Sequence, residues 1–168
     1  MTPIQGTRTV RVKLDEFNLL GPGARRGIIL GITEAAFAIE QRAKYGVVEQ
    51  DAVDTGALMN SIYTQSALSD GRDAAVAAAA MASTTKGKHS GKPHDEPFTD
   101  HLAEEEHKGE GLTAKVGVAA EYGIYIEDGT PSGSVTPRPF LGPAAESVRG
   151  KLASIVGKQL RIALKWGG

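Results

Sequence analysis

The chain has 168 residues, of which 40% are hydrophobic and 5% aromatic, and this length and composition predict one domain, residues 1–168, around a single core. Nineteen basic residues balance 20 acidic ones, so the net charge of −1 does not mark the whole chain as a nucleic-acid or membrane binder. No cysteine is present, which excludes disulfide scaffolds, thiol catalysis and thiolate metal sites. We expect no signal peptide and no membrane partner, because no apolar run approaches the roughly 18 residues that a membrane span needs.

The N-terminal region predicts a strand followed by a long helix. Residues 7–15 alternate between apolar and polar side chains, which is the pattern of a half-buried strand. From Ala24 to about Lys44 the apolar residues recur at helical spacing, and Gly46 is well placed to end that helix. Gly27 and Gly31 lie four residues apart on it, a spacing that predicts close approach of another backbone.

A second group of short elements follows. Asp54 and Thr55 are expected to cap a helix of one or two turns that turns Leu58 inward. Residues 61–68 then predict a strand, 69–71 a turn, and 73–82 a helix in preference to a strand. Residues 84–111 are polar and rich in histidine and acid, and they form the main part of a predicted insertion at about 71–111.

The C-terminal third predicts one more strand at 112–119, a short apolar element at 121–130, and a final helix to about Lys165. Pro143 suits the first turn of that helix. Beside its main apolar stripe, Val156, Leu160 and Leu164 form a second apolar edge, which suggests a second partner such as a neighbouring subunit. The predicted fold class is therefore α+β: a small, mostly antiparallel sheet packed against two long helices, with a polar insertion.

Four histidines fall within the insertion: His89, His94, His101 and His107. Glu104 and His107 have the spacing of a di-metal half-site, but that arrangement needs two such motifs and the chain has one. A solvated polar loop is the favoured interpretation, and a metal that orders the loop is the alternative.

Nucleophile and phosphate motifs are also missing. No serine lies in Gly-x-Ser-x-Gly, and Gly21-Pro22-Gly23 lacks the residues of a phosphate loop. Tyr122 and Tyr125 are more simply explained by packing in the core or at an interface than by stacking on nucleic-acid bases. We therefore predict no catalytic, cofactor-binding or metal-ligating residue.

Charge is unevenly distributed along the chain. Residues 94–110 hold seven acids against one lysine, whereas residues 146–168 hold five bases against Glu146. Two independent solvated faces would explain this, and so would contact between the acidic insertion of one copy and the basic helix of another. The candidate subunit contacts are Glu104, Glu105, Glu106, Arg149, Lys151, Lys158 and Arg161.

Two segments carry a family resemblance. Residues 53–62 read Val-Asp-Thr-Gly-Ala-Leu-Met-Asn-Ser-Ile. Residues 121–130 read Glu-Tyr-Gly-Ile-Tyr-Ile-Glu-Asp-Gly-Thr, and 137–144 read Pro-Arg-Pro-Phe-Leu-Gly-Pro-Ala. In this order and spacing they resemble the tail-component family of long-tailed bacteriophages, over roughly residues 24–68 and 112–165. The motif residues are Asp54, Thr55, Gly56, Leu58, Tyr122, Tyr125, Glu127, Gly129, Arg138, Pro139 and Phe140.

The resemblance implies a protein of the head–tail junction, or neck, that completes the tail without catalysis. It implies a homo-oligomeric ring, with six copies suggested, around a channel through which genomic DNA passes without sequence-specific binding. The implied partners are an adjacent connector or stopper protein and the tail-terminator or tail-tube protein, in a virion assembled in the host cytoplasm. The alternatives are a tail terminator that caps the tube, a metal-dependent enzyme using the histidine-rich insertion, and an adaptor unconnected with virions. Gly123 and Asp128 replace residues that are more often apolar in the family, which suggests a more exposed turn there.

Overall fold

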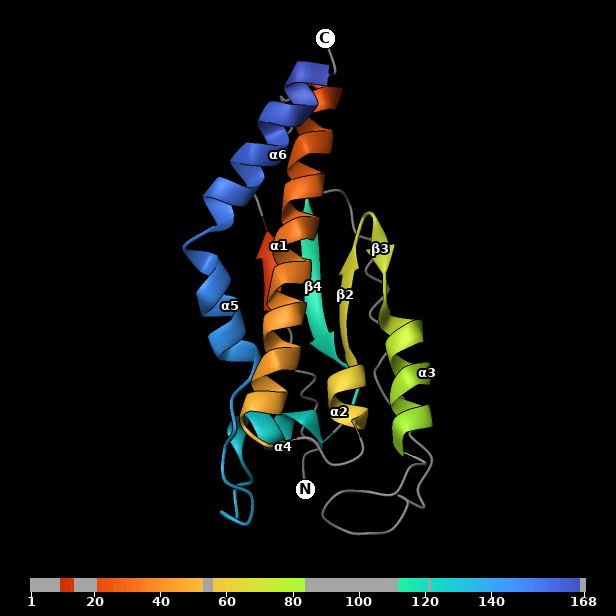
Figure 1. Ribbon diagram of the computed structural model, residues 1–168, viewed down its shortest axis with the longest axis vertical. Coiled ribbons are helices and arrows are strands. Elements are labelled where there is room, and N and C mark those ends of the chain that lie inside the picture. Colours follow the sequence, from red (N-terminus) through yellow and green to blue (C-terminus); the bar gives the residue numbers. More distant parts are fainter. Residues whose placement is uncertain (1–9, 14–20, 53–55, 84–111, 121, 167–168) are drawn as a thin grey trace.

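The computed structural model describes residues 10–13, 21–52, 56–83, 112–120 and 122–166, and it is an α+β structure (Figure 1). Its strands are β1 (Val10–Lys13), β2 (Ile62–Ser66), β3 (Ser69–Asp70) and β4 (Thr113–Val118). Its helices are α1 (Pro22–Glu49), α2 (Ala57–Asn60), α3 (Arg72–Ser83), α4 (Gly123–Asp128), α5 (Leu141–Arg149) and α6 (Leu152–Trp166). The predicted fold class is confirmed.

The four strands form one sheet in the order β1-β4-β2-β3, and each neighbouring pair is antiparallel. Val10 pairs with Val116 and Ile62 with Val118, so the first strand of the chain lies beside the last one. Tyr63 on β2 lies opposite Gly117 on β4, and its ring occupies the space that a side chain at Gly117 would need. The predicted turn at 69–71 is wrong in detail, because residues 67–68 make the turn and Ser69–Asp70 pair with β2.

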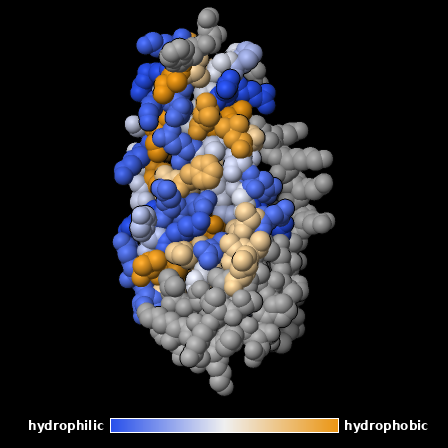
Figure 2. Space-filling view, turned by 45° about the vertical axis from the view of Figure 1, so that its right-hand side comes forward, coloured by the Kyte–Doolittle hydropathy of each residue, from blue (hydrophilic) through white to orange (hydrophobic). Residues whose placement is uncertain are grey.

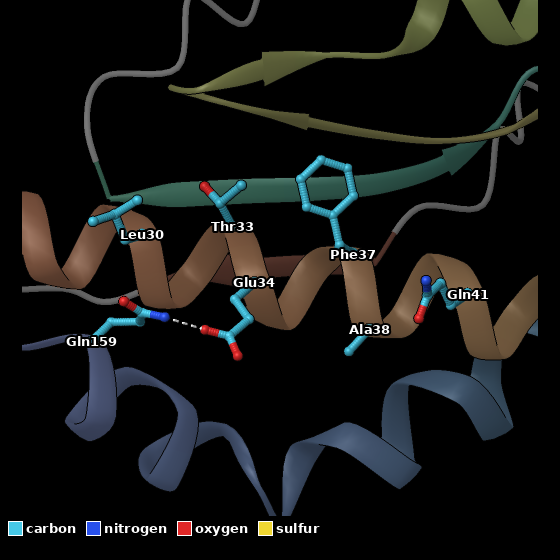
Figure 3. Close-up of a pocket in the computed structure, with 7 residues that line it drawn as sticks. All are labelled: Leu30, Thr33, Glu34, Phe37, Ala38, Gln41 and Gln159. Atoms are coloured by element: carbon cyan, nitrogen blue, oxygen red, sulfur yellow. Dashed lines mark hydrogen bonds between the residues drawn. The ribbon is translucent and has the colours of Figure 1, made fainter.

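Helix α1 lies between the sheet and the pair α5–α6 (Figures 1 and 3). Its apolar face is buried as the spacing predicts, and strands, α2 and α5 complete the same core. The core includes Ile28, Ile32, Ala35, Ala36, Ile39, Ala43, Val47, Leu58, Ile62, Val116, Val118, Phe140, Leu141, Ala144 and Val148. One continuous core therefore holds the two chain segments that flank residues 84–111 together.

The α1–α6 crossing confirms the prediction made from Gly27 and Gly31. A β-carbon added to Gly27 would lie 2.8 Å from the Leu160 Cα, and one added to Gly31 would lie 2.6 Å from the Val156 Cα. The two backbones therefore meet at these glycines. Val156 and Leu160 pack on α1 of their own chain, so these two residues do not require the second partner that their apolar edge suggested. Leu164, the third residue of that edge, is 57% exposed, and a second partner for it stays a prediction.

Two helix boundaries differ from the predictions. Helix α1 continues past Gly46 to Glu49, because Gly46 faces Phe140 inside the structure instead of ending the helix. The predicted final helix is split into α5 and α6 at Gly150–Lys151, so the second long helix is only partly confirmed. The helix predicted at 73–82 is confirmed as α3, and the remainder of the predicted insertion, residues 84–111, lies outside the described residues.

Candidate functional site

The carboxylate of Glu127 joins α4 to α5. Its side chain is only 4% exposed, and it accepts three hydrogen bonds from backbone N–H groups at the start of α5. Oε2 accepts from Phe140 N at 2.7 Å and Leu141 N at 2.9 Å, and Oε1 accepts from Gly142 N at 2.8 Å. The first N–H groups of a helix have no partner within the helix, and a negative charge is favourable at that end of the helix dipole. Glu127 therefore caps α5 from a different helix.

The loop between α4 and α5 is fixed by further contacts to the end of α1. Gly129 has a φ of 77°, and a β-carbon there would lie 2.9 Å from both the Val135 carbonyl oxygen and the Pro137 Cγ. Arg138 donates from its backbone N to the Ile126 carbonyl at 2.7 Å and from Nη1 to the Asp51 carbonyl at 3.1 Å. Glycine at 129 is thus required both by its backbone conformation and by the surrounding atoms.

Phe140 and Pro139 complete this region against α1. Phe140 is 2% exposed and lies over Gly46, where an added β-carbon would be 3.2 Å from the Phe140 Cβ. Gln50 donates from Nε2 to the Pro139 carbonyl at 2.5 Å. We call the set Gly46, Glu127, Gly129, Arg138 and Phe140 the clasp. It fixes the start of α5 to the end of α1.

The other motif segment lies beside α4. Gly56 precedes α2 with a φ of 88°, as expected for a glycine at a tight turn, and Leu58 is buried. A β-carbon at Gly123 would lie 2.7 Å from the Val118 Cγ1 and 3.4 Å from the Leu58 Cδ1. The two motif segments are therefore neighbours at the same end of the molecule. The predicted caps Asp54 and Thr55 lie outside the described residues.

Tyr122 and Tyr125 lie at the surface, whereas Phe140 is buried. They are 42% and 38% exposed, so the interpretation of these tyrosines as packing anchors within the core is wrong. An interface with another molecule remains the other sequence-based interpretation. Asp128 is exposed and Gly123 is buried, so the more exposed turn expected here is found at Asp128 and not at Gly123.

The predicted basic contact residues Arg149, Lys151, Lys158 and Arg161 are all exposed on α5 and α6 or at the junction between these helices. Arg149 forms an exposed ion pair with Glu146 at 3.2 Å, and Lys158 approaches Glu34 of α1 at 3.8 Å. The proposed acidic partners Glu104, Glu105 and Glu106 lie outside the described residues, so that contact stays a prediction.

A shallow groove of about 500 Å³ runs over the outer side of α1 (Figure 3). Its lining residues are Leu30, Thr33, Glu34, Phe37, Ala38, Gln41 and Gln159. Glu34 is its one ionisable group, and the carboxylate accepts a hydrogen bond from the Gln159 Nε2 at 2.5 Å. General acid–base catalysis uses positioned titratable groups, so a groove lined by one such group is poorly suited to that chemistry.

The four histidines lie outside the described residues, and within the described part no three His, Cys, Asp or Glu side chains gather as a metal site. Nor does any helix in that part have the length and apolar character needed to cross a bilayer. No family model, curated protein or solved structure matches the chain.

The sequence identified Glu127 as a motif residue but missed its capping role. Helix caps are recognised by residues within one turn of the helix start, and Glu127 precedes Leu141 by 14 positions, with the loop between them. The one available signal was an acidic residue, Glu127, directly after the apolar run Ile124-Tyr125-Ile126, and Asp128 beside it weakens that signal.

Proposed function

We propose that this chain is a non-enzymatic structural protein of the bacteriophage virion, placed at the neck between head and tail. In this proposal it completes the tail, and its copies form a ring around the channel through which DNA passes. Its neighbours are a connector or stopper protein on one side and the tail-terminator or tail-tube protein on the other.

The observation that carries the proposal is the meeting of the motif segments. The resemblance rests on residues 53–62, 121–130 and 137–144, and the described parts of all three lie around α4 at the end of α1. Their residues have structural roles there: Glu127 caps α5, Gly129 permits a turn at positive φ, and Phe140 fills a space over Gly46. Such an arrangement suits a motif that maintains a shape.

Exposed apolar side chains support the assembly part of the proposal. Tyr122 and Tyr125 lie at the surface of α4, and Ile162 and Leu164 are exposed on α6. Tyrosine is enriched at protein interfaces, where its ring is buried and its hydroxyl finds a partner. Different surfaces that meet head to tail generate a closed ring when the rotation between copies closes.

The proposal is tested by the mass and symmetry of the purified full-length protein. Native mass spectrometry and electron microscopy should give closed rings with one copy number, for which the resemblance suggests six. A protein that stays monomeric across the micromolar range, alone and with extracts of assembled particles, would contradict the proposal.

A virion that lacks the protein distinguishes the two neck roles. Tails of normal length that fail to join heads support completion. Overlong tails support the alternative of a tail terminator, because a terminator stops polymerisation of the tube.

A further inference from the structure

We propose that the outward face of α6 contacts the sugar–phosphate backbone of duplex DNA without reading its sequence. This inference deepens the proposed function, since it assigns one surface of the subunit to the DNA that the ring would surround. It concerns the residues Lys151, Lys158, Arg161 and Lys165, which we call the basic stripe.

Three residues of the basic stripe lie on one side of α6, because the spacings of three and four residues place Lys158, Arg161 and Lys165 on one helix face. Lys151 directly precedes the helix at its junction with α5, and all four side chains are exposed. The opposite face, with Val156 and Leu160, packs on α1. From Lys151 to Lys165 the stripe extends for about 21 Å at a helical rise of about 1.5 Å per residue.

The start of α1 extends this positive charge. Gly23 lies next to α6, where an added β-carbon would be 3.8 Å from the Ala163 carbonyl oxygen. Arg25 and Arg26 follow at once and are both exposed. Residues 21–33 and 147–166 contain no Asp or Glu, although the chain as a whole carries a net charge of −1. The next acid along α1 is Glu34, which lies 3.8 Å from Lys158 and offsets part of its charge. This end of the helix pair therefore carries a net positive charge within a nearly neutral protein.

The surface between the charges is made of small side chains. Ser154 is exposed and Gly157 is half-buried, and the nearest atom to a β-carbon added at Gly157 would be the Arg161 Nη1 at 3.9 Å. A broad partner can therefore approach the helix backbone closely. Duplex DNA is such a partner, with about one negative charge per 1.7 Å of its axis.

A protein partner fits this face less well. The cores of protein interfaces are depleted of lysine and enriched in aromatic residues, whereas three of the four stripe residues are lysines. Ile162 and Leu164 flank the stripe, where they remain available for the contacts between copies proposed above. Figure 2 brings forward the side of the molecule that lies to the right in Figure 1, and there too the apolar patches are interrupted by hydrophilic side chains. Contact with Glu104–Glu106 of another copy is the competing prediction for the same bases, and the experiment separates the two.

The test measures binding of the full-length protein to a fluorescently labelled 30-base-pair duplex across a series of salt concentrations. Four phosphate contacts predict that log K falls against log[salt] with a slope of roughly −3.6, or about −0.9 per contact. The double variant K158Q/R161Q should bind about tenfold more weakly at low salt and lose about half of the slope. Duplexes of unrelated sequence should bind equally well.

The matched control is R42Q/K44Q, which removes one arginine and one lysine from the last third of α1. Helix α6 packs on the other end of α1, at Gly27 and Gly31. It should bind DNA like the wild type. Equal losses in both double variants, or no salt-dependent binding by the wild type, would overturn the proposal.

Assembly is measured on the same samples by native mass spectrometry. Rings that persist in K158Q/R161Q with weakened DNA binding support the inference. Loss of assembly in K158Q/R161Q with DNA binding unchanged overturns it in favour of the acidic contact. If the wild type forms rings but does not bind DNA, this inference is overturned and the proposed ring is retained. If the wild type binds DNA but stays monomeric, the proposed ring is overturned and this inference is retained.

Discussion

The two ends of α1 are fixed to the C-terminal helices in opposite ways. Near its start, Gly27 and Gly31 let the backbone of α6 come within contact distance, so close packing holds the helices together, with one side-chain hydrogen bond from Gln159 to Glu34 beside it. Near its end, the clasp uses a buried carboxylate and three backbone hydrogen bonds to place α5. Both ends have glycines that leave no space for an added atom, but only the second also depends on an acceptor whose removal leaves buried N–H groups unpaired.

The largest expected effect is at the clasp. Glu127→Ala leaves three N–H groups at the start of α5 without their acceptor in a buried site, and it should lower the free energy of unfolding by about 4 kcal/mol. Glu127→Gln keeps the shape and one acceptor oxygen, so its loss should be about 2 kcal/mol. Urea denaturation followed by circular dichroism measures both. A loss below about 1 kcal/mol for the alanine variant would show that the cap is not stabilising.

The glycine crossing should respond to a single methyl group. Gly31→Ala places its β-carbon 2.6 Å from the Val156 Cα, so α6 must move. Overpacking of this kind costs about 2 kcal/mol, despite the higher helix propensity of alanine. The melting temperature should fall accordingly. An unchanged melting temperature would indicate that α6 does not lie this close to α1.

Gly157→Ala is the same substitution in open space. No atom lies within 3.9 Å of the new β-carbon, and Gly157 has no left-handed conformation to lose. Helix propensity then predicts a gain of up to about 1 kcal/mol in the free energy of unfolding. Opposite signs at Gly31 and Gly157, measured in the same denaturation assay, would separate the effect of packing from that of propensity.

Glu49→Gln is the exposed counterpart of Glu127→Gln and should have the smallest effect. Glu49 forms an ion pair with Arg42 at 3.2 Å, and the side chains of Glu49 and Arg42 are 58% and 50% exposed. Surface pairs of this kind contribute about 0.5 kcal/mol or less, and added salt should remove the difference. A loss as large as that of Glu127→Gln would mean that burial does not distinguish the two carboxylates.

The same contrast explains how far sequence reasoning could reach. The crossing was predictable because Gly27 and Gly31 and the apolar positions of α1 share one helical period, and the strands were predictable from alternation. The clasp was only partly predictable. A resemblance marked its residues, but no local pattern connects Glu127 with N–H groups beyond a 12-residue gap in the chain.

Three further differences have related causes. Gly46 has the composition of a helix end, and only the position of Phe140 explains why the helix continues past it. The break at Gly150 lies in a sequence whose apolar spacing is continuous. Sequence reasoning also assigned Tyr122 and Tyr125 to packing in the core or at an interface, without distinguishing between the two.

The pairing of α1 with α6 has a consequence for synthesis of the protein. Val156, which contacts Gly31, is added by the ribosome 125 residues after it. Gln159, which donates a hydrogen bond to the Glu34 carboxylate, is also added 125 residues after its partner. Until residues 156–160 have been made, the first long helix has one flank uncovered. Contacts of such sequence separation slow folding, so the nascent chain is exposed to premature association until α6 can pack on α1.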